Sequence, residues 1–146
     1  MEKTNEMVTC NSAAFDGNIE SLKYAHEHGI GKLDIIAYLM AVQNGHLECL
    51  KYISQNSTDD YIFDVSHDYM SCLIAAKKGY LECLQHSHEN GHKWDVWTCV
   101  EAAKNGHLDC LKYAVEHDCP CDAEARQLAT ENNHQECVDY LISKNL

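Results

Sequence analysis

The sequence is poor in basic residues, in proline and in long apolar runs. It carries 11 Lys and Arg against 23 Asp and Glu, which gives a formal net charge of −12. Nucleic acids and anionic membrane surfaces are bound through Lys and Arg that displace counterions, so neither is expected as a partner. The longest apolar run, residues 35–42, is too short to span a bilayer. Pro120 is the one proline, and there is little low-complexity sequence.

Catalytic and targeting signatures are missing as well. The sequence has no nucleophile elbow, Walker A loop, His-Glu-x-x-His motif or dinucleotide fingerprint, which predicts a protein without enzymatic activity or a cofactor. Residues 1–6 lack the apolar region of a secretory signal. The nine cysteines are an odd number, which suits reduced thiols, so we expect a cytoplasmic or nuclear protein.

What the sequence does contain is one motif in five copies. Gly-His-Leu-Asp-Cys-Leu-Lys-Tyr at residues 106–113 nearly matches residues 45–52, and worn copies occupy residues 17–24, 79–86 and 133–140. The copies start 28, 34, 27 and 27 residues apart. A period in this range is typical of a solenoid of stacked repeats, which presents an extended surface and seldom holds a catalytic pocket.

Each repeat predicts a pair of short antiparallel helices. An acidic residue stands eleven positions before each copy of the motif, at Glu6, Asp34, Asp68, Asp95 and Asp122. A carboxylate there caps the free N–H groups of a first turn, so we expect the first helix of each repeat to begin at this point. The motif glycine ends that helix in the left-handed conformation. The second helix lies within the motif, where apolar residues recur at a three-to-four spacing.

Residues 102–113 carry a resemblance to a known family. Their sequence, Ala-Ala-Lys-Asn-Gly-His-Leu-Asp-Cys-Leu-Lys-Tyr, resembles the ankyrin repeat, whose helices join through an Ala-Ala-x-x-Gly-His-Leu-x-Val-Val-Lys-Leu-Leu core. Cys99, Cys110 and Tyr113, with the turns at 89–91 and 119–120, look closer to the short ankyrin-like repeat abundant in giant DNA viruses of amoebae. The unit is about six residues shorter than the usual 33-residue repeat, so the β-hairpin finger is expected as a tight loop.

The resemblance implies an all-α, right-handed solenoid of about five ankyrin-like helix-turn-helix repeats. We expect a single domain over residues 1–146, with repeats at about 6–32, 33–66, 67–93, 94–120 and 121–146. The resemblance also implies recognition of a protein partner without catalysis.

The many cysteines suggest metal binding, but their spacing argues against it. One buried position is shared by Cys49, Cys83, Cys110 and Cys137, and another by Cys10, Cys72 and Cys99. Ligands spread one per repeat would lie about 10 Å apart, too far to share a zinc ion. The local cluster of His117, Cys119 and Cys121 lacks the Cys-x-x-Cys spacing of structural zinc sites. We therefore predict small apolar core residues and no metal site.

The motif histidines are predicted to have a structural role. His46, His107 and His134 follow the turn between the two helices of their repeats. We predict that they bond backbone groups of the turn and take no part in acid–base chemistry.

The 34-residue spacing between the second and third copies of the motif departs from the regular period, and the segment inserted there is a candidate for partner contact. This segment, residues 54–65, includes Tyr61 and Phe63 between acidic residues. Insertions in solenoids project as loops and often contact partners. Alternatively, Ile62 or Phe63 is buried and fills the widened joint, and the sequence leaves both possibilities open.

Tryptophan marks a second candidate region. Trp94 matches the tryptophan in the turn of the resembled sub-family and is expected to act as a structural staple. Trp97 stands where most repeats carry a smaller residue, and tryptophan is enriched at binding hot spots. By the ankyrin resemblance, the first helices line a concave face, which adds Tyr69, Glu101 and Lys104 as candidates.

These features together predict a non-catalytic protein–protein interaction module that is a monomer or a weak homodimer. If the viral resemblance holds, the protein is a factor that binds a host protein in the host cell cytoplasm or nucleus. The alternative is a self-associating structural or virion-associated protein whose stacked ends pair.

Overall fold

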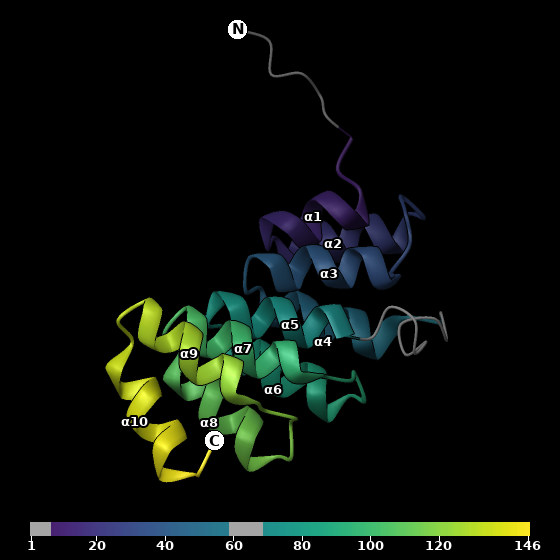
Figure 1. Ribbon diagram of the computed structural model, residues 1–146. Helices are drawn as coiled ribbons and strands as arrows, with labels where there is room; N and C mark the ends of the chain where they lie inside the picture. The colour runs from purple at the N-terminus through teal and green to yellow at the C-terminus, as the bar shows by residue number, and fades with distance from the viewer. Residues whose placement is uncertain (1–6, 59–68) are drawn as a thin grey trace, which may run out of the picture. The chain divides into compact units, whose positions relative to one another are not determined.

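The fold is described from a computed structural model that defines residues 7–58 and 69–146. Over these residues the chain forms ten α-helices and no strand, which confirms the predicted all-α class (Figure 1). The helices are α1 (Cys10–Asp16), α2 (Ile19–Glu27), α3 (Ile35–Gln43), α4 (Leu47–Asn56), α5 (Tyr69–Lys78), α6 (Leu81–Glu89), α7 (Val96–Lys104), α8 (Leu108–Glu116), α9 (Ala123–Glu131) and α10 (Gln135–Ser143).

The helices form two compact units. Unit 1 spans residues 1–62 and holds α1–α4, and unit 2 spans residues 63–146 and holds α5–α10. The single domain predicted over residues 1–146, with its five repeat boundaries, stays a prediction.

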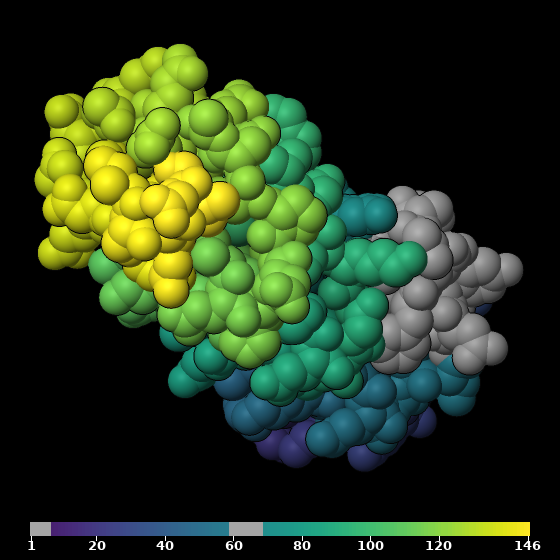
Figure 2. Space-filling view, turned by 60° about the horizontal axis from the view of Figure 1, so that its bottom comes forward, coloured from purple at the N-terminus to yellow at the C-terminus, as the bar shows by residue number. Residues whose placement is uncertain are grey.

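Within each unit, helices pack as pairs in two layers. Each odd-numbered helix, the first helix of a repeat, packs on the even-numbered second helix that follows it. The first helices also stack on one another, α1 on α3 in unit 1, and α5 on α7 on α9 in unit 2. In Figure 2 the colour of unit 2 passes in order from teal to yellow, so successive repeats lie next to one another.

Aspartate caps start three of the first helices as predicted. Asp34 accepts from the N–H of Ile36 at 3.0 Å, and Asp95 accepts from the N–H of Trp97 at the same distance. Asp122 caps α9 in the same way. Asp68 lies outside the described residues.

The start predicted for the first repeat at Glu6 was wrong. Helix α1 begins at Cys10 and is capped by Thr9, whose hydroxyl accepts from the Ser12 N–H at 3.2 Å. The Ser12 hydroxyl accepts in turn from the Thr9 N–H at 2.9 Å. A capping box satisfies two free N–H groups at once, which makes Thr9 the better cap.

The first helices end one or two residues before the motif glycine. Gly17, Gly45, Gly79 and Gly106 have φ between 72° and 79°, a region that side chains with a Cβ adopt at a cost. Asn133 takes the equivalent place in the last repeat, with φ of 61°.

The core combines small residues of the first helices with leucines of the second, and it also includes larger residues of the first helices such as Tyr38 and Val100. Pairs such as Ala75 and Ala76, or Ala102 and Ala103, are fully buried where first helices stack. Leu84 and Leu111 are fully buried on the second helices, and burial of a leucine contributes about 1.5–3 kcal/mol. No helix in residues 7–58 or 69–146 is long and apolar enough to cross a membrane.

Candidate functional site

The six residues predicted to contact a partner divide into two groups. Tyr61 and Phe63 lie outside the described residues. Tyr69 is the first residue of α5 and is 38% exposed, and the other three lie on α7. Trp97, Glu101 and Lys104 are spaced by four and three residues, so they share one face of that helix.

The same positions of α5 and α9 extend this face across unit 2. They stand nine, five and two residues before the first residue of the motif. Because α5 packs on α7 and α7 on α9, equivalent positions point to one side of the stack. The resulting surface, which we call the first-helix face, consists of Met70, Ile74, Lys77, Trp97, Glu101, Lys104, Glu124, Leu128 and Glu131. Each of these residues is exposed or half-buried.

Large apolar side chains recur at one position of this surface. Trp97 is 47% exposed and Met70 is 46% exposed. The equivalent residues of unit 1, Val8 and Ile36, are exposed to a similar degree. Packing within the repeats leaves these side chains uncovered, and recurring exposed apolar residues mark interaction sites more often than single ones do.

Met70, Ile74 and Lys77 were not among the partner-contact residues predicted from the sequence. The signal that could have found Met70 was the recurrence of an apolar residue nine positions before the motif, in four of the five repeats. Ile74 and Lys77 follow once the face of the helix is known, because they stand four and seven residues after Met70.

The charges of the face are unevenly distributed. Lys104 Nζ lies 3.9 Å from Glu101 Oε1, a weak surface pair. The Glu101 carboxylate also accepts from Asn105 Nδ2 at 3.1 Å, which draws it toward the end of α7. Lys77 and Lys78 are exposed, and neither forms an ion pair with a described residue. Glu124 and Glu131 make the α9 side of the face acidic.

The opposite layer carries aromatic contacts that connect consecutive repeats. Tyr113 Oη hydrogen-bonds His88 Nδ1 at 2.9 Å, and His26 forms the same bond with Tyr52 in unit 1. Trp94 stacks on His88 with ring centroids 3.7 Å apart and meets Tyr113 edge-on, which is a structural role. Burial, helped by the neighbouring His117, lowers the pKa of His88, so its ring stays neutral in this cluster.

The motif histidines do not bond the turn backbone, contrary to prediction. The side chains of His46, His107 and His134 form no hydrogen bond with the described residues. They pack instead over the motif glycine of the preceding repeat. A Cβ added to Gly79 would lie 2.5 Å from His107 Nδ1, and one added to Gly106 would lie 2.4 Å from His134 Nδ1.

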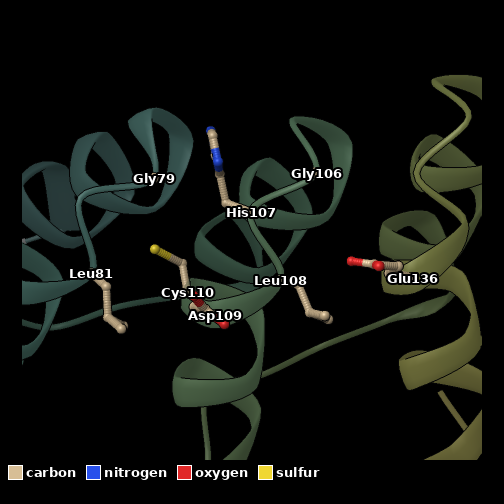
Figure 3. Close-up of a pocket in the computed structure, with 8 residues that line it drawn as sticks. All are labelled: Gly79, Leu81, Gly106, His107, Leu108, Asp109, Cys110 and Glu136. Atoms are coloured by element: carbon tan, nitrogen blue, oxygen red, sulfur yellow. The ribbon is translucent and has the colours of Figure 1, made fainter.

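Figure 3 shows His107 beside the Gly79 turn, at the rim of a pocket. The pocket has a volume of about 320 Å³ and lies between the first turns of neighbouring second helices. Leu81, Asp109 and Glu136 also line it. It is therefore a surface hollow between neighbouring repeats of unit 2, beside the contact of His107 with Gly79.

The thiols are placed for packing and poorly suited to catalysis. Burial raises the pKa of Cys83 to about 11 and that of Cys110 to about 12, which keeps both thiols protonated. The sequence had grouped Cys119 and Cys121 with His117, whereas the structure brings them to Cys99 on α7. Contact with the Cys119 thiol and burial raise the pKa of Cys99, and contact with Cys99 raises that of Cys121. A thiol held protonated is a weak nucleophile.

Metal ligands do not gather in the described part of the chain. Across residues 7–58 and 69–146, no three His, Cys, Asp or Glu side chains are arranged to hold a metal ion. All nine cysteines are free thiols, and all except Cys121 are buried.

Comparison with known proteins agrees with this repeat architecture. A family model described as ankyrin repeats in three copies matches residues 72–146. Among solved structures, the human ASB11 ankyrin repeat domain is similar with a TM-score of 0.78 and 22% sequence identity, over 92% of this chain and 67% of that one. At this identity the likeness shows the fold alone. No curated protein matches the chain. These matches do not support the finer resemblance to the giant-virus sub-family.

Proposed function

The chain belongs to the ankyrin-repeat family, whose members are generally non-catalytic modules of protein–protein interaction, and from this premise we propose that it binds another protein through the first-helix face of unit 2. The proposal includes the absence of enzymatic activity. It is supported by thiols whose raised pKa values make them weak nucleophiles and by the placement of histidines in packing contacts.

One observation carries the proposal. Trp97 and Met70 are both nearly half exposed, at the same repeat position of two helices that pack together. Tryptophan truncation at interfaces is among the most costly of substitutions, because the large ring fills a pocket on the partner. Tyr69 stands beside Met70 in α5, and Glu101 and Lys104 follow Trp97 on the same face of α7, so they are proposed to supply the polar rim of the contact. Tyr61 and Phe63, in the 54–65 insertion, are proposed as further partner-contact residues.

The finer proposal concerns source and location. We infer a cytoplasmic or nuclear protein, because eight cysteines are buried as free thiols, which persist in reducing compartments. The short repeat unit suggests a viral factor that binds a host protein, in which case the protein acts in the host cell. The protein acts as a monomer or weak homodimer.

Affinity capture with a matched pair of variants tests the proposal. The wild type, a Met70→Ala/Trp97→Ala variant and an Ile142→Ala control are immobilised and exposed to the same cell lysate. Ile142 is 54% exposed on α10, so its removal deletes a comparable apolar side chain away from the first-helix face. Circular dichroism must first show that all three proteins are equally folded.

The expected result is a protein captured by the wild type and by Ile142→Ala but lost with Met70→Ala/Trp97→Ala. Light scattering on the same samples separates this outcome from self-association. A stable dimer that the double variant abolishes, with no other protein captured, would replace the proposal with the structural alternative.

A further inference from the structure

Two lysines of the first-helix face, Lys77 and Lys104, and the adjacent Lys78 are placed in a way that the fold does not require. Lys77 and Lys78 end α5, and Lys104 ends α7. Cations at a helix C-terminus complement the helix dipole, which is the simplest explanation of such lysines. The other first helices do not follow that rule, because Asp16 ends α1 and Glu131 ends α9.

The lysines occur instead on the same helices as the exposed apolar residues. Lys77 stands seven residues after Met70 on α5, and Lys104 stands seven residues after Trp97 on α7. Each helix therefore presents an apolar side chain near its start and an ammonium group near its end, about two turns or 10 Å apart. Lys77 and Lys78 form no ion pair with a described residue, and the contact of Lys104 with Glu101 is long at 3.9 Å.

The lysines of α5 and α7 stand out against the negative net charge of the chain. The chain has a net charge of −12, so a patch of three lysines, of which Lys77 and Lys78 form no ion pair with a described residue, is a local exception. On the α9 side the face becomes acidic through Glu124 and Glu131. An acidic ligand would be attracted over α5 and α7 and repelled over α9.

We propose that the segment recognised by the first-helix face is a short acidic peptide with one large apolar side chain. The apolar side chain packs on Met70, Ile74 and Trp97, and the carboxylates meet Lys77, Lys78 and Lys104. The proposal rests on the proposed function and specifies the chemistry of its ligand. The segment lies over α5 and α7 and stops before α9.

A random twelve-residue peptide library displayed on phage is the probe. It is selected on the wild type, and the enriched peptides are synthesised and measured by fluorescence anisotropy. Four variants are compared: Trp97→Ala, Lys77→Glu/Lys104→Glu, Glu131→Lys and Glu116→Lys. Glu116 is exposed on α8, in the opposite layer, so Glu116→Lys makes the same change in net charge away from the face.

Enriched peptides are expected to carry one large apolar residue beside two or more Asp or Glu. Lys77→Glu/Lys104→Glu should weaken their binding about tenfold, since exposed ion pairs each change affinity by about two- to fivefold. Glu131→Lys should strengthen it about two- to fivefold, because it extends the row of lysines onto α9, whereas Glu116→Lys should leave it within that margin. A merely structural role for these residues would not produce a gain.

Two other outcomes separate the inference from the function on which it rests. Peptides that depend on Trp97 but lack acidic residues, and that bind Lys77→Glu/Lys104→Glu normally, would overturn the acidic ligand and leave the proposed function standing. The absence of any peptide that loses binding with Trp97→Ala would count against the surface itself and so against both.

Discussion

Replacing Gly106 with alanine should destabilise the protein for two separable reasons. Gly106 has φ of 74°, and a non-glycine residue in this conformation costs about 1–2 kcal/mol. The new Cβ would also stand 2.4 Å from His134 Nδ1 and 2.6 Å from its Cε1. Both contacts are too short, so the ring must move, and overpacking of this kind costs about 1–3 kcal/mol. The expected total is about 2–5 kcal/mol of lost unfolding free energy.

Gly91→Ala is the matched control. Gly91 has a similar conformation, with φ of 91°, but a Cβ there would meet nothing within 4 Å. Its replacement should cost the backbone strain alone, about 1–2 kcal/mol. Urea unfolding followed by circular dichroism at 222 nm gives both free energies, and their difference isolates the contact with His134.

A double-mutant cycle completes the test. In a His134→Ala background the imidazole is gone, so Gly106→Ala should cost no more than Gly91→Ala. Equal costs for Gly106→Ala and Gly91→Ala in the wild type, or an undiminished cost in the His134→Ala background, would refute the proposed packing of histidine over glycine.

Three further predictions follow from caps, burial and thiol exposure. Asp95→Ala removes the cap of α7 and should lower the free energy of unfolding by about 1 kcal/mol in urea titrations. Burial, with a smaller contribution from His86, lowers the pKa of His92 from 6.5 to about 4. Between pH 6.5 and pH 4, His92 is therefore protonated in the unfolded chain but stays neutral in the folded one. Stability should drop by about 2 kcal/mol more between pH 7 and pH 5 in the wild type than in His92→Ile, and should be unaffected by this group above pH 7. At pH 8, a chromogenic thiol reagent should react with less than about one thiol of the native protein within minutes, through the half-buried Cys121. The denatured protein should react through all nine cysteines. Rapid reaction of the other thiols in the native protein would contradict their burial.

The helices could be predicted because their signals are local. Asp95 and the motif glycine Gly106 lie at the two ends of α7, and each acts through backbone groups within one turn. The one failure, Glu6, arose because Thr9 and Ser12 form a reciprocal cap that a search for acidic residues overlooks.

The contacts between repeats could not be predicted in the same way. Gly79 and His107 are 28 residues apart, and only the stacking of two repeats brings the ring onto the backbone. Cys99 meets Cys119 and Cys121 for the same reason. The exposure of Met70 depends on which side of α5 the neighbouring helices cover, and the sequence pattern of one helix does not fix this.

The packing of histidine over glycine gives the repeat array a direction. In three pairs of neighbouring repeats, the earlier repeat presents a bare glycine backbone and the later repeat places an imidazole over it: Gly17 with His46, Gly79 with His107, and Gly106 with His134. The contact therefore has one direction along the chain. The first repeat has Asn18 where the others have an aromatic ring, and the last has Asn133 where the others have glycine. If one copy were placed head-to-tail on another, Asn18 would face Asn133. Neither the aromatic ring nor the bare glycine backbone of the histidine–glycine contact would then be present. A head-to-tail contact between two copies would therefore lack the packing of histidine over glycine, which works against open-ended fibres.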